Sequence, residues 1–430
     1  MAPNATPPKP TLRSKLHLRP STSLKVSKAS VFTLLALISI QTVSSALLWY
    51  AGKIKADSSS RVVTTSPASS VTTTGATLSG TYDYPTDVTQ RGFQYGLTTG
   101  YGSQVIDSGA NGYSLVATQP LGTPLSPRGM VSDQSGNTYI ADYTSSTIKK
   151  FSPTGSLLLQ WGGEGASDGQ FYQIGGIAIG PSGSLYVSEI AGSRVQKFDQ
   201  SGNFISKFAL QPLLLGTTQT YGNGIAVDGS ENVFVAGAGD TDSGSTWSNT
   251  PFVQKYSGGV YVSQIGSLGS GDGQYGDVPG VAADNAGNVY IYDPVGSRVE
   301  KFNASGSYVA QWGSYGSGPG QFANVVGMTI DSAGLLYVAD GGNGRVQVLQ
   351  LNGTYVSEWA DSNFEYSWLR GLSVDSTGKI RTVGESSILL GLPKINVEIS
   401  SLQCDTTYHY RAFTTDADST EYGADATFTT

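Results

Sequence analysis

One sequence pattern occurs six times in the chain, and this repetition constrains the fold more than any other feature. Its fullest copy is GMTIDSAGLLYVADGGNGRVQVLQ, residues 327–350. The copies open at glycines spaced 47, 48, 56, 47 and 44 residues apart, namely Gly129, Gly176, Gly224, Gly280, Gly327 and Gly371. A period of this length is typical of a repeat protein in which each copy forms one supersecondary unit.

Within each copy, apolar and polar residues alternate for a few positions, stop at a Ser, Asn or Gly turn, and alternate again. This two-residue period predicts short antiparallel strands, about four in each copy. A lone sheet of that size leaves one face uncovered, so the copies are expected to pack on one another in a ring. The composition agrees, because 56 Gly and 24 Tyr with 13% charged residues suit turn-rich β structure. The prediction is an all-β chain with a six-bladed β-propeller over residues 111–391.

The repeated phrase resembles the NHL repeat, in which Gly-Gln-Phe precedes Gly, three apolar residues and Asp, followed by apolar-Tyr-Val-Ala-Asp and Asn-x-Arg-Val-Gln-Val. The resemblance is fullest in GQFANVVGMTIDSAGLLYVADGGNGRVQVLQ, residues 320–350. Thr147 and Phe252 stand where other copies have arginine, and Arg381 stands where they have tyrosine. We expect the sheets of those three copies to be the weakest.

The N-terminal region predicts export. Residues 1–30 hold six basic and no acidic residues and are rich in Pro, Ser and Thr, which is typical of a disordered tail. Residues 31–51, VFTLLALISIQTVSSALLWYA, are uncharged and long enough to form a transmembrane helix. The basic flank places the N-terminus in the cytoplasm, and residues 52–61 form a linker on the other side. The alternative is a cleaved signal peptide, with Ser44 and Ala46 as the small residues before the cut.

Under either alternative, everything after this segment lies outside the cell, as a single-pass protein of the cell membrane or as a secreted one. The exported part carries 17 basic and 32 acidic residues, a net charge of −15. Such a surface repels phosphate backbones, so nucleic acid is not an expected partner.

Two segments outside the repeats resemble the halves of one fibronectin type III-like domain of bacterial surface proteins. Residues 62–106 contain ATLSGTY and GFQYGLTTGYGS, which resemble the first half, and residues 395–430 resemble the second. Leu402, Thr407 and Tyr408 stand at the positions of that family's tyrosine corner. A β-sandwich interrupted by a propeller requires the ends of the propeller to lie close together. Residues 111–122 read like the fourth strand of the other copies and are therefore expected to complete the last sheet.

Residues that could carry chemistry are few. The resemblance extends to the peptide-amidating lyase, which looks like a metal enzyme built on several histidines, but this chain has only His17 and His409. A histidine-based zinc site is excluded on that count. The acids that end the second strand in four copies could ring the channel mouth and bind a cation such as Ca²⁺, or each could pair with a nearby arginine; they are Asp142, Glu189, Asp293 and Asp340. The acids before the Ser/Asn/Gly turns are predicted to organise those turns; they are Asp133, Asp228, Asp284, Asp331 and Asp375.

The third copy is lengthened by GAGDTDSGSTWSNTPF between its second and third strands. Asp240 and Asp242 resemble the start of a calcium loop, although no acid follows at the closing position. Trp247 on this Gly/Ser loop is the kind of aromatic side chain that binding surfaces use. These three residues are the predicted ligand-binding residues.

Two functions from different classes follow. The first is a non-enzymatic binding or adhesion protein on the cell surface that recognises an extracellular protein or polysaccharide and needs no cofactor. The second, the alternative, is an exported propeller lyase or hydrolase with an acid-lined site for a divalent cation.

Overall fold

The computed structural model describes most of the chain after the N-terminal region. The described residues are 62–83, 88–107, 112–122, 124–212, 219–240, 249–277, 280–360, 364, 371–375, 378–416 and 419–430. The predicted membrane segment, residues 31–51, lies outside them. Within these described ranges, no helix is long and apolar enough to cross a bilayer. The regular structure found there is β-sheet apart from one 3-10 helix, η1 (Gly341–Asn343), so the prediction of an all-β chain is confirmed.

Five sheets in the described part of the chain have four antiparallel strands joined in chain order. Their strands are β6 (Pro127–Ser132), β7 (Thr138–Asp142), β8 (Thr147–Phe151) and β9 (Leu157–Gly162); β10 (Ile174–Ile179), β11 (Leu185–Glu189), β12 (Arg194–Phe198) and β13 (Phe204–Ala209); β14 (Gln219–Val227), β15 (Val233–Asp240), β16 (Asn249–Ser257) and β17 (Val260–Gln264); β20 (Gly280–Ala283), β21 (Val289–Asp293), β22 (Arg298–Phe302) and β23 (Tyr308–Trp312); and β24 (Val325–Ile330), β25 (Leu335–Asp340), β26 (Arg345–Gln350) and β27 (Tyr355–Ala360).

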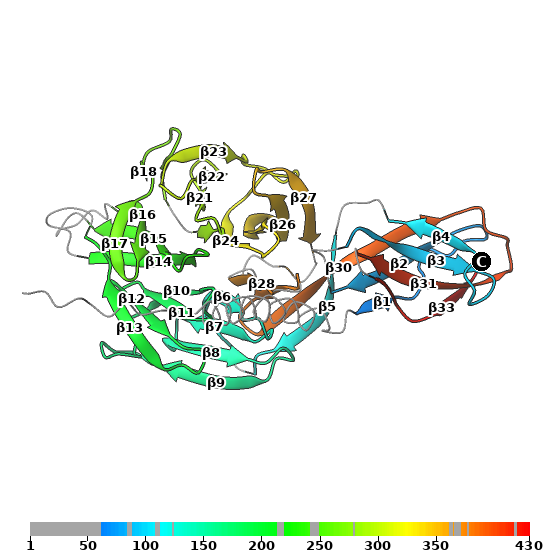
Figure 1. Cartoon of the computed structure of the whole chain (residues 1–430), viewed down its shortest axis with the longest axis horizontal. Helices are drawn as coiled ribbons and strands as arrows, with labels where there is room; N and C mark the ends of the chain where they lie inside the picture. The colour runs from blue at the N-terminus through cyan, green and yellow to red at the C-terminus, as the bar shows by residue number, and fades with distance from the viewer. Residues whose placement is uncertain are drawn as a thin grey trace, which may run out of the picture. The chain divides into compact units, whose positions relative to one another are not determined.

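A further set of strands has the same layout but takes its last strand from a distant part of the sequence. β28 (Gly371–Val374) pairs with β29 (Ile380–Val383), β29 with β30 (Ser387–Ile399), and β30 with β5 (Tyr113–Pro120). The first strands contact one another in the order β6, β10, β14, β20, β24, β28 and back to β6. Figure 1 shows the sheets following one another around a common centre with these first strands innermost.

Aromatic and branched side chains between neighbouring sheets form the core. One cluster joins Tyr139 and Ile148 of the first sheet to Phe171, Val187 and Phe198 of the second, and all five are buried. The second strands β7, β11 and β21 are buried along their whole length because sheets cover both of their faces. The contacts between adjacent sheets therefore hold the ring together.

β30 belongs to two sheets at once. Its first part pairs with β29 and β5, and its last part pairs with β2 (Ala76–Tyr82), which pairs in turn with β1 (Val63–Thr65). A separate sheet contains β3 (Gln90–Gly96), β4 (Ser103–Ile106), β31 (Thr407–Thr415), β32 (Thr420–Tyr422) and β33 (Ala426–Thr429). Leu78 and Ile395 pack with Phe93 and Tyr410 in one core between these two sheets. The Tyr408 hydroxyl accepts a hydrogen bond from the backbone N–H of Gln403 at 3.0 Å.

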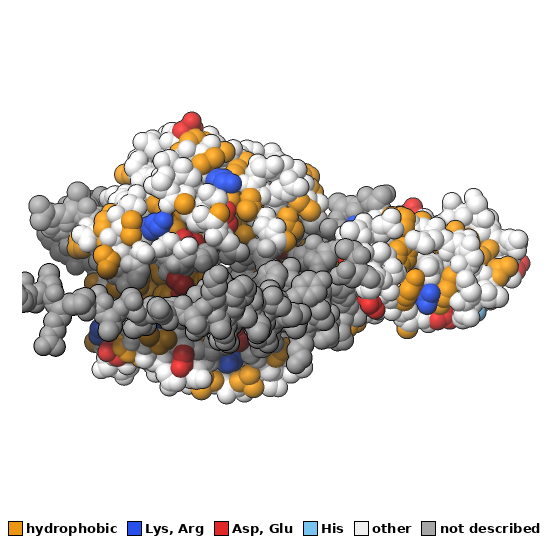
Figure 2. Space-filling model, in the orientation of Figure 1, with side chains coloured by type: hydrophobic (Ala, Val, Ile, Leu, Met, Phe, Trp, Pro, Cys, Tyr) orange, Lys and Arg blue, Asp and Glu red, His pale blue; other side chains and the backbone are white. Residues whose placement is uncertain are grey.

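The fourth strands face solvent. Leu157, Ile205, Val260 and Val309 on these strands are each at least half exposed. Figure 2 shows hydrophobic side chains scattered over the face in view, with few charged side chains among them.

Candidate functional site: the central channel

Three adjoining cavities mark a channel along the centre of the ring. The middle cavity, about 190 Å³, is lined by all six first strands and includes Met130, Met328 and Leu372. It shares Ile330 with a larger cavity of about 420 Å³ at the mouth formed by the Ser/Asn/Gly turns. A smaller cavity of about 90 Å³ lies at the opposite mouth. The larger mouth is the roomiest place for a ligand among these three.

Carboxylates from three sheets line the larger mouth, namely Asp133, Asp228 and Asp331. In the first turn, Asp133 Oδ1 accepts the backbone N–H groups of Ser135 and Asn137, both at 2.9 Å. Its Oδ2 accepts from Asn137 Nδ2 at 2.9 Å and from the Tyr139 hydroxyl at 3.1 Å. Asp228 and Asp284 make the equivalent bonds to Asn232 and Asn288. These acids organise their own turns.

Asp331 differs from Asp133, Asp228 and Asp284 because Leu335 stands where they have asparagine. Its Oδ1 accepts the backbone N–H groups of Ala333 and Leu335, but its Oδ2 accepts only from the Tyr337 hydroxyl, at 2.9 Å. That hydroxyl also lies 3.2 Å from the hydroxyl of Tyr113 on β5. Burial raises the pKa of Asp331 above its ordinary value, and the hydrogen bonds oppose this only in part. The mouth therefore holds one carboxylate with increased affinity for a proton.

The second sheet has no acid at this turn, and a neighbouring sheet supplies one. Gly180 occupies the position, and Glu231 of the next turn accepts the backbone N–H of Ser182 at 2.8 Å and the Tyr186 hydroxyl. Asp133 makes the same two kinds of contact within its own sheet. Glu231 therefore connects the second and third sheets at the channel mouth.

Replacing Glu231 with alanine is expected to lower the free energy of unfolding by about 1–2 kcal/mol, because Tyr186 and Ser182 lose a charged acceptor. Urea denaturation checks this, with Glu398→Ala on the exposed face of β30 as the matched control, expected within about 0.5 kcal/mol of wild type. Equal stability of the two variants would show that the contact between sheets contributes nothing.

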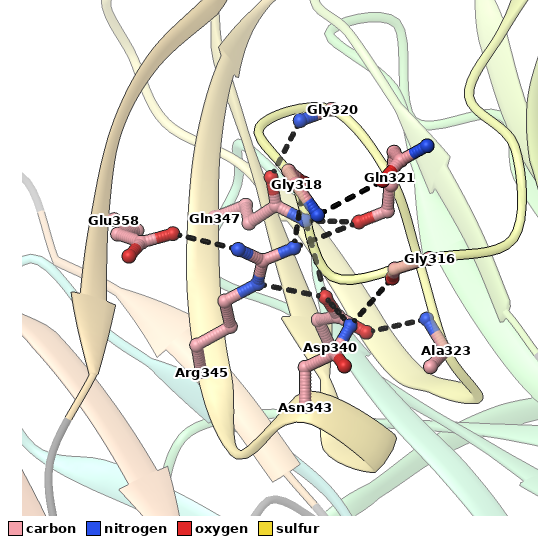
Figure 3. A network of polar contacts seen from close by, with 10 residues as sticks. All are labelled: Gly316, Gly318, Gly320, Gln321, Ala323, Asp340, Asn343, Arg345, Gln347 and Glu358. Atoms are coloured by element: carbon pink, nitrogen blue, oxygen red, sulfur yellow. Dashed lines mark hydrogen bonds and ion pairs between the residues drawn. The ribbon is translucent and has the colours of Figure 1, made fainter.

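The four acids predicted as cation ligands lie in buried ion pairs instead. Asp142 pairs with Lys149 at 2.9 Å, and Asp340 pairs with Arg345 at 2.9 Å. Glu189 pairs with Arg194, and Asp293 lies 3.4 Å from Arg298. Figure 3 shows Asp340, Arg345 and Gln347 converging beneath the glycine loop of residues 316–323. Asp340 accepts the backbone N–H of Ala323 at 2.7 Å, and Arg345 Nη2 donates to the carbonyl oxygens of Gly318 and Gln321. The pairs thus fasten the loops that lead from one sheet to the next.

This arrangement does not fit a shared cation. Each acid belongs to a different sheet and already has a basic partner, and cations do not favour such a donor set. Among the residues that the structure describes, no three His, Cys, Asp or Glu side chains are grouped as ligands of one ion. At the larger mouth, Asp133 and Asp228 accept hydrogen bonds from their own turns through both carboxylate oxygens.

Most of the predicted ligand-binding loop lies outside the described residues. Asp240 is the last residue of β15, opposite Gln219 and Asn249. Asp242 and Trp247 lie outside the described residues. The prediction of a ligand contact there remains a prediction.

Three of the glycine loops that lead from one sheet to the next share one conformation. In each of three loops a short parallel bridge forms, at Glu164 with Phe171, at β18 (Ser267–Leu268) with β19 (Gln274–Tyr275), and at Tyr315 with Phe322. Gly165, Gly269 and Gly316 have φ angles of 155°, 151° and 153°, which a side chain would strain. The mouth on this side includes the exposed Arg128 and Asn223 but no acid among its described lining residues.

Known proteins resemble this chain in its repeat and its fold. Residues 322–349 match the NHL repeat. No curated protein matches the sequence. A virginiamycin B lyase from Staphylococcus aureus is similar at 11% identity over 65% of this chain and 99% of that one, with a TM-score of 0.44. A gluconolactonase from Xanthomonas campestris is similar at 14% identity over 78% of this chain and 100% of that one, with a TM-score of 0.47. The calcium-binding protein regucalcin from Agrobacterium tumefaciens is similar at 12% identity over 68% of this chain and 99% of that one, with a TM-score of 0.47. At such identities the likeness is one of fold, the propeller type.

The comparisons contradict the main functional expectation, a non-enzymatic binding or adhesion protein. Several of the similar structures carry the names of enzymes, including a streptogramin B lyase, a gluconolactonase and a luciferin-regenerating enzyme. These names agree better with the alternative expectation, a lyase or hydrolase. The expectation was wrong because it took the resemblance to recognition scaffolds as evidence of function, whereas one scaffold hosts many activities.

Proposed function

We propose that the chain is an exported enzyme of the lyase or hydrolase class, built as a six-bladed propeller and a fibronectin type III-like sandwich. Its substrate binds at the larger channel mouth, and Asp331 acts as the general base. We include export in the proposal because residues 31–51 can anchor or direct the chain to the membrane.

The position of Asp331 is the observation that carries this proposal. It is a buried carboxylate, 8% exposed, that lines the 420 Å³ cavity and has a raised pKa. A carboxylate with raised proton affinity in a cleft is a candidate general base. It takes a proton from a carbon beside a carbonyl in an elimination, or from a water molecule that adds to an ester carbonyl in a hydrolysis. Tyr337 holds the carboxylate in place through its hydroxyl.

Replacing Asp331 with asparagine is expected to lower kcat by about 100-fold or more, because asparagine keeps the shape of the turn but cannot accept the proton. The assay measures turnover of two compounds, gluconolactone and a streptogramin B. Both are taken from the names of the similar structures.

Asp284→Asn is the matched control, since it alters the same kind of turn but is not among the lining residues of the larger mouth. It is expected to keep the wild-type rate. Turnover by the Asp331 variant at the wild-type rate would contradict the proposal.

A further inference from the structure

The third strands carry a polar residue two positions after the site of the arginine, and in three sheets it is glutamine; these are Gln196, Gln254 and Gln347. Gln347 Nε2 donates to the Gln321 carbonyl at 2.6 Å and to Asp340 at 3.1 Å, while its Oε1 accepts from the backbone N–H of Gly320 at 2.9 Å. Gln196 makes the same three bonds in its sheet, to Gln170, Glu189 and Gly169. The amide therefore fastens the glycine loop to the sheet through two donors and one acceptor.

In β22 this residue is Glu300, and the network is incomplete. The side chain is 0% exposed, yet neither carboxylate oxygen has a hydrogen-bond donor. Arg298 Nη2 forms an ion pair with Oε1 at 2.7 Å, but this nitrogen also donates to the carbonyl oxygens of Ser270, Gly271 and Gln274. Arg298 Nε also makes no hydrogen bond to the acid at the end of the second strand. It lies 3.4 Å from Asp293 Oδ2, whereas Arg345 Nε lies 2.9 Å from Asp340 Oδ2. Glutamine at this position would supply donors that a carboxylate lacks.

The charges around Glu300 do not balance if it is ionised. Its own strand contributes Arg298, whereas β21 contributes Asp293 and the glycine loop contributes Asp272. Tyr275 on β19 and Tyr308 on β23 are the other titratable groups that face it. A buried negative charge that must share one guanidinium with another carboxylate is costly. Burial, followed by repulsion from Asp293 and Asp272, raises the pKa of Glu300 to about 7, although Arg298 opposes the shift.

We propose that Glu300 is a proton-operated latch on its glycine loop, residues 266–276. The protonated acid supplies one O–H, which replaces a glutamine N–H and donates to the Gln274 carbonyl or to the Asp293 carboxylate. Loss of this proton to solvent removes the donor and leaves two buried carboxylates beside one guanidinium, so the loop is released. The loop leads to β20, whose Gly280 and Val281 line the channel. The latch thus makes one part of the channel wall sensitive to pH.

The direction of the pH dependence follows from proton binding. A glutamate in an unfolded chain titrates near pH ~4.3, so the folded protein holds an extra proton between about that pH and pH 7. The stability contributed by the latch is complete below this window and is lost as the pH rises through 7. This dependence does not require the proposed enzyme activity.

Hydrogen exchange of the full chain between pH 5 and pH 8, corrected for the intrinsic exchange rate, tests the latch directly. In wild type, the protection of residues 266–276 is expected to fall at least 10-fold as the pH rises. Glu300→Gln is expected to abolish this fall and to raise the thermal midpoint at pH 8. Gln347→Glu is expected to make the protection of another loop, residues 314–322, fall as the pH rises.

Gln347→Glu is prepared at pH 5, where the introduced acid is protonated; unfolding at pH 8 but not at pH 5 also supports the latch. Constant protection of residues 266–276 across this range in wild type would overturn the proposal. So would a Glu300→Gln variant that follows the wild-type pH curve.

Discussion

Replacing Asp340 with alanine is expected to lower the free energy of unfolding by about 3–5 kcal/mol, because Arg345 loses its fully buried carboxylate and keeps only the partly exposed Glu358. Arg345 is only 6% exposed, and Asp340 also accepts bonds from Ala323, Asn343 and Gln347. Denaturation with urea measures the loss.

Two variants make this result specific to the buried charge. Asp199→Ala removes an acid that organises a turn nearer the surface, and it is expected to cost about 1 kcal/mol. Adding Arg345→Met to Asp340→Ala is expected to restore part of the lost stability, since it removes a buried guanidinium whose only remaining carboxylate is the partly exposed Glu358. A single Asp340→Ala variant within about 1 kcal/mol of wild type would contradict the assigned role of the pair.

Deleting residues 395–430 is expected to abolish the protection of residues 63–106 from hydrogen exchange. The deletion removes the part of β30 that pairs with β2 and the whole of β31, which pairs with β3. It also removes most of the core that encloses Leu78 and Phe93, including Ile395 and Tyr410. The remaining strands would expose their apolar faces and unpaired edges. Unchanged protection of residues 63–106 would show that they fold without the C-terminal segment.

Local patterns predicted the parts of the structure that depend on neighbouring residues. The position of Asp133 before a Ser/Asn/Gly turn indicated a turn-forming acid, and its hydrogen bonds close within that turn. The reading of residues 111–122 as a fourth strand relied on their likeness to other copies, and β5 pairs with β30 in the structure. Both follow from short-range alternation and turn chemistry.

Contacts between sheets could not be predicted in the same way. The sequence around Gly180, which lacks the turn acid, does not show that Glu231 supplies the carboxylate there. The two residues come together only when adjacent sheets pack. The expected weakness at Thr147 overlooked Lys149, which lies two residues later and supplies the cation for Asp142. The four acids expected as cation ligands share a position in the repeat, but ring symmetry keeps that position in separate sheets.

Two signals were present in the sequence and were missed. Leu335 replaces asparagine after Asp331, and Glu300 replaces glutamine after Arg298. Each is a departure from the commonest residue of the repeat at a buried position, where an absent donor changes the affinity of a carboxylate for its proton. Such departures identify candidate functional residues more directly than the repeated residues, which serve the scaffold.

A crystal structure of the Asp331→Asn variant with an intact substrate tests the proposed function most directly. The account predicts the substrate in the larger mouth, with its acidic C–H or attacking water within about 2.6–3.2 Å of the residue 331 side chain. A substrate bound instead at the opposite mouth, beside Arg128 and Asn223, would contradict it.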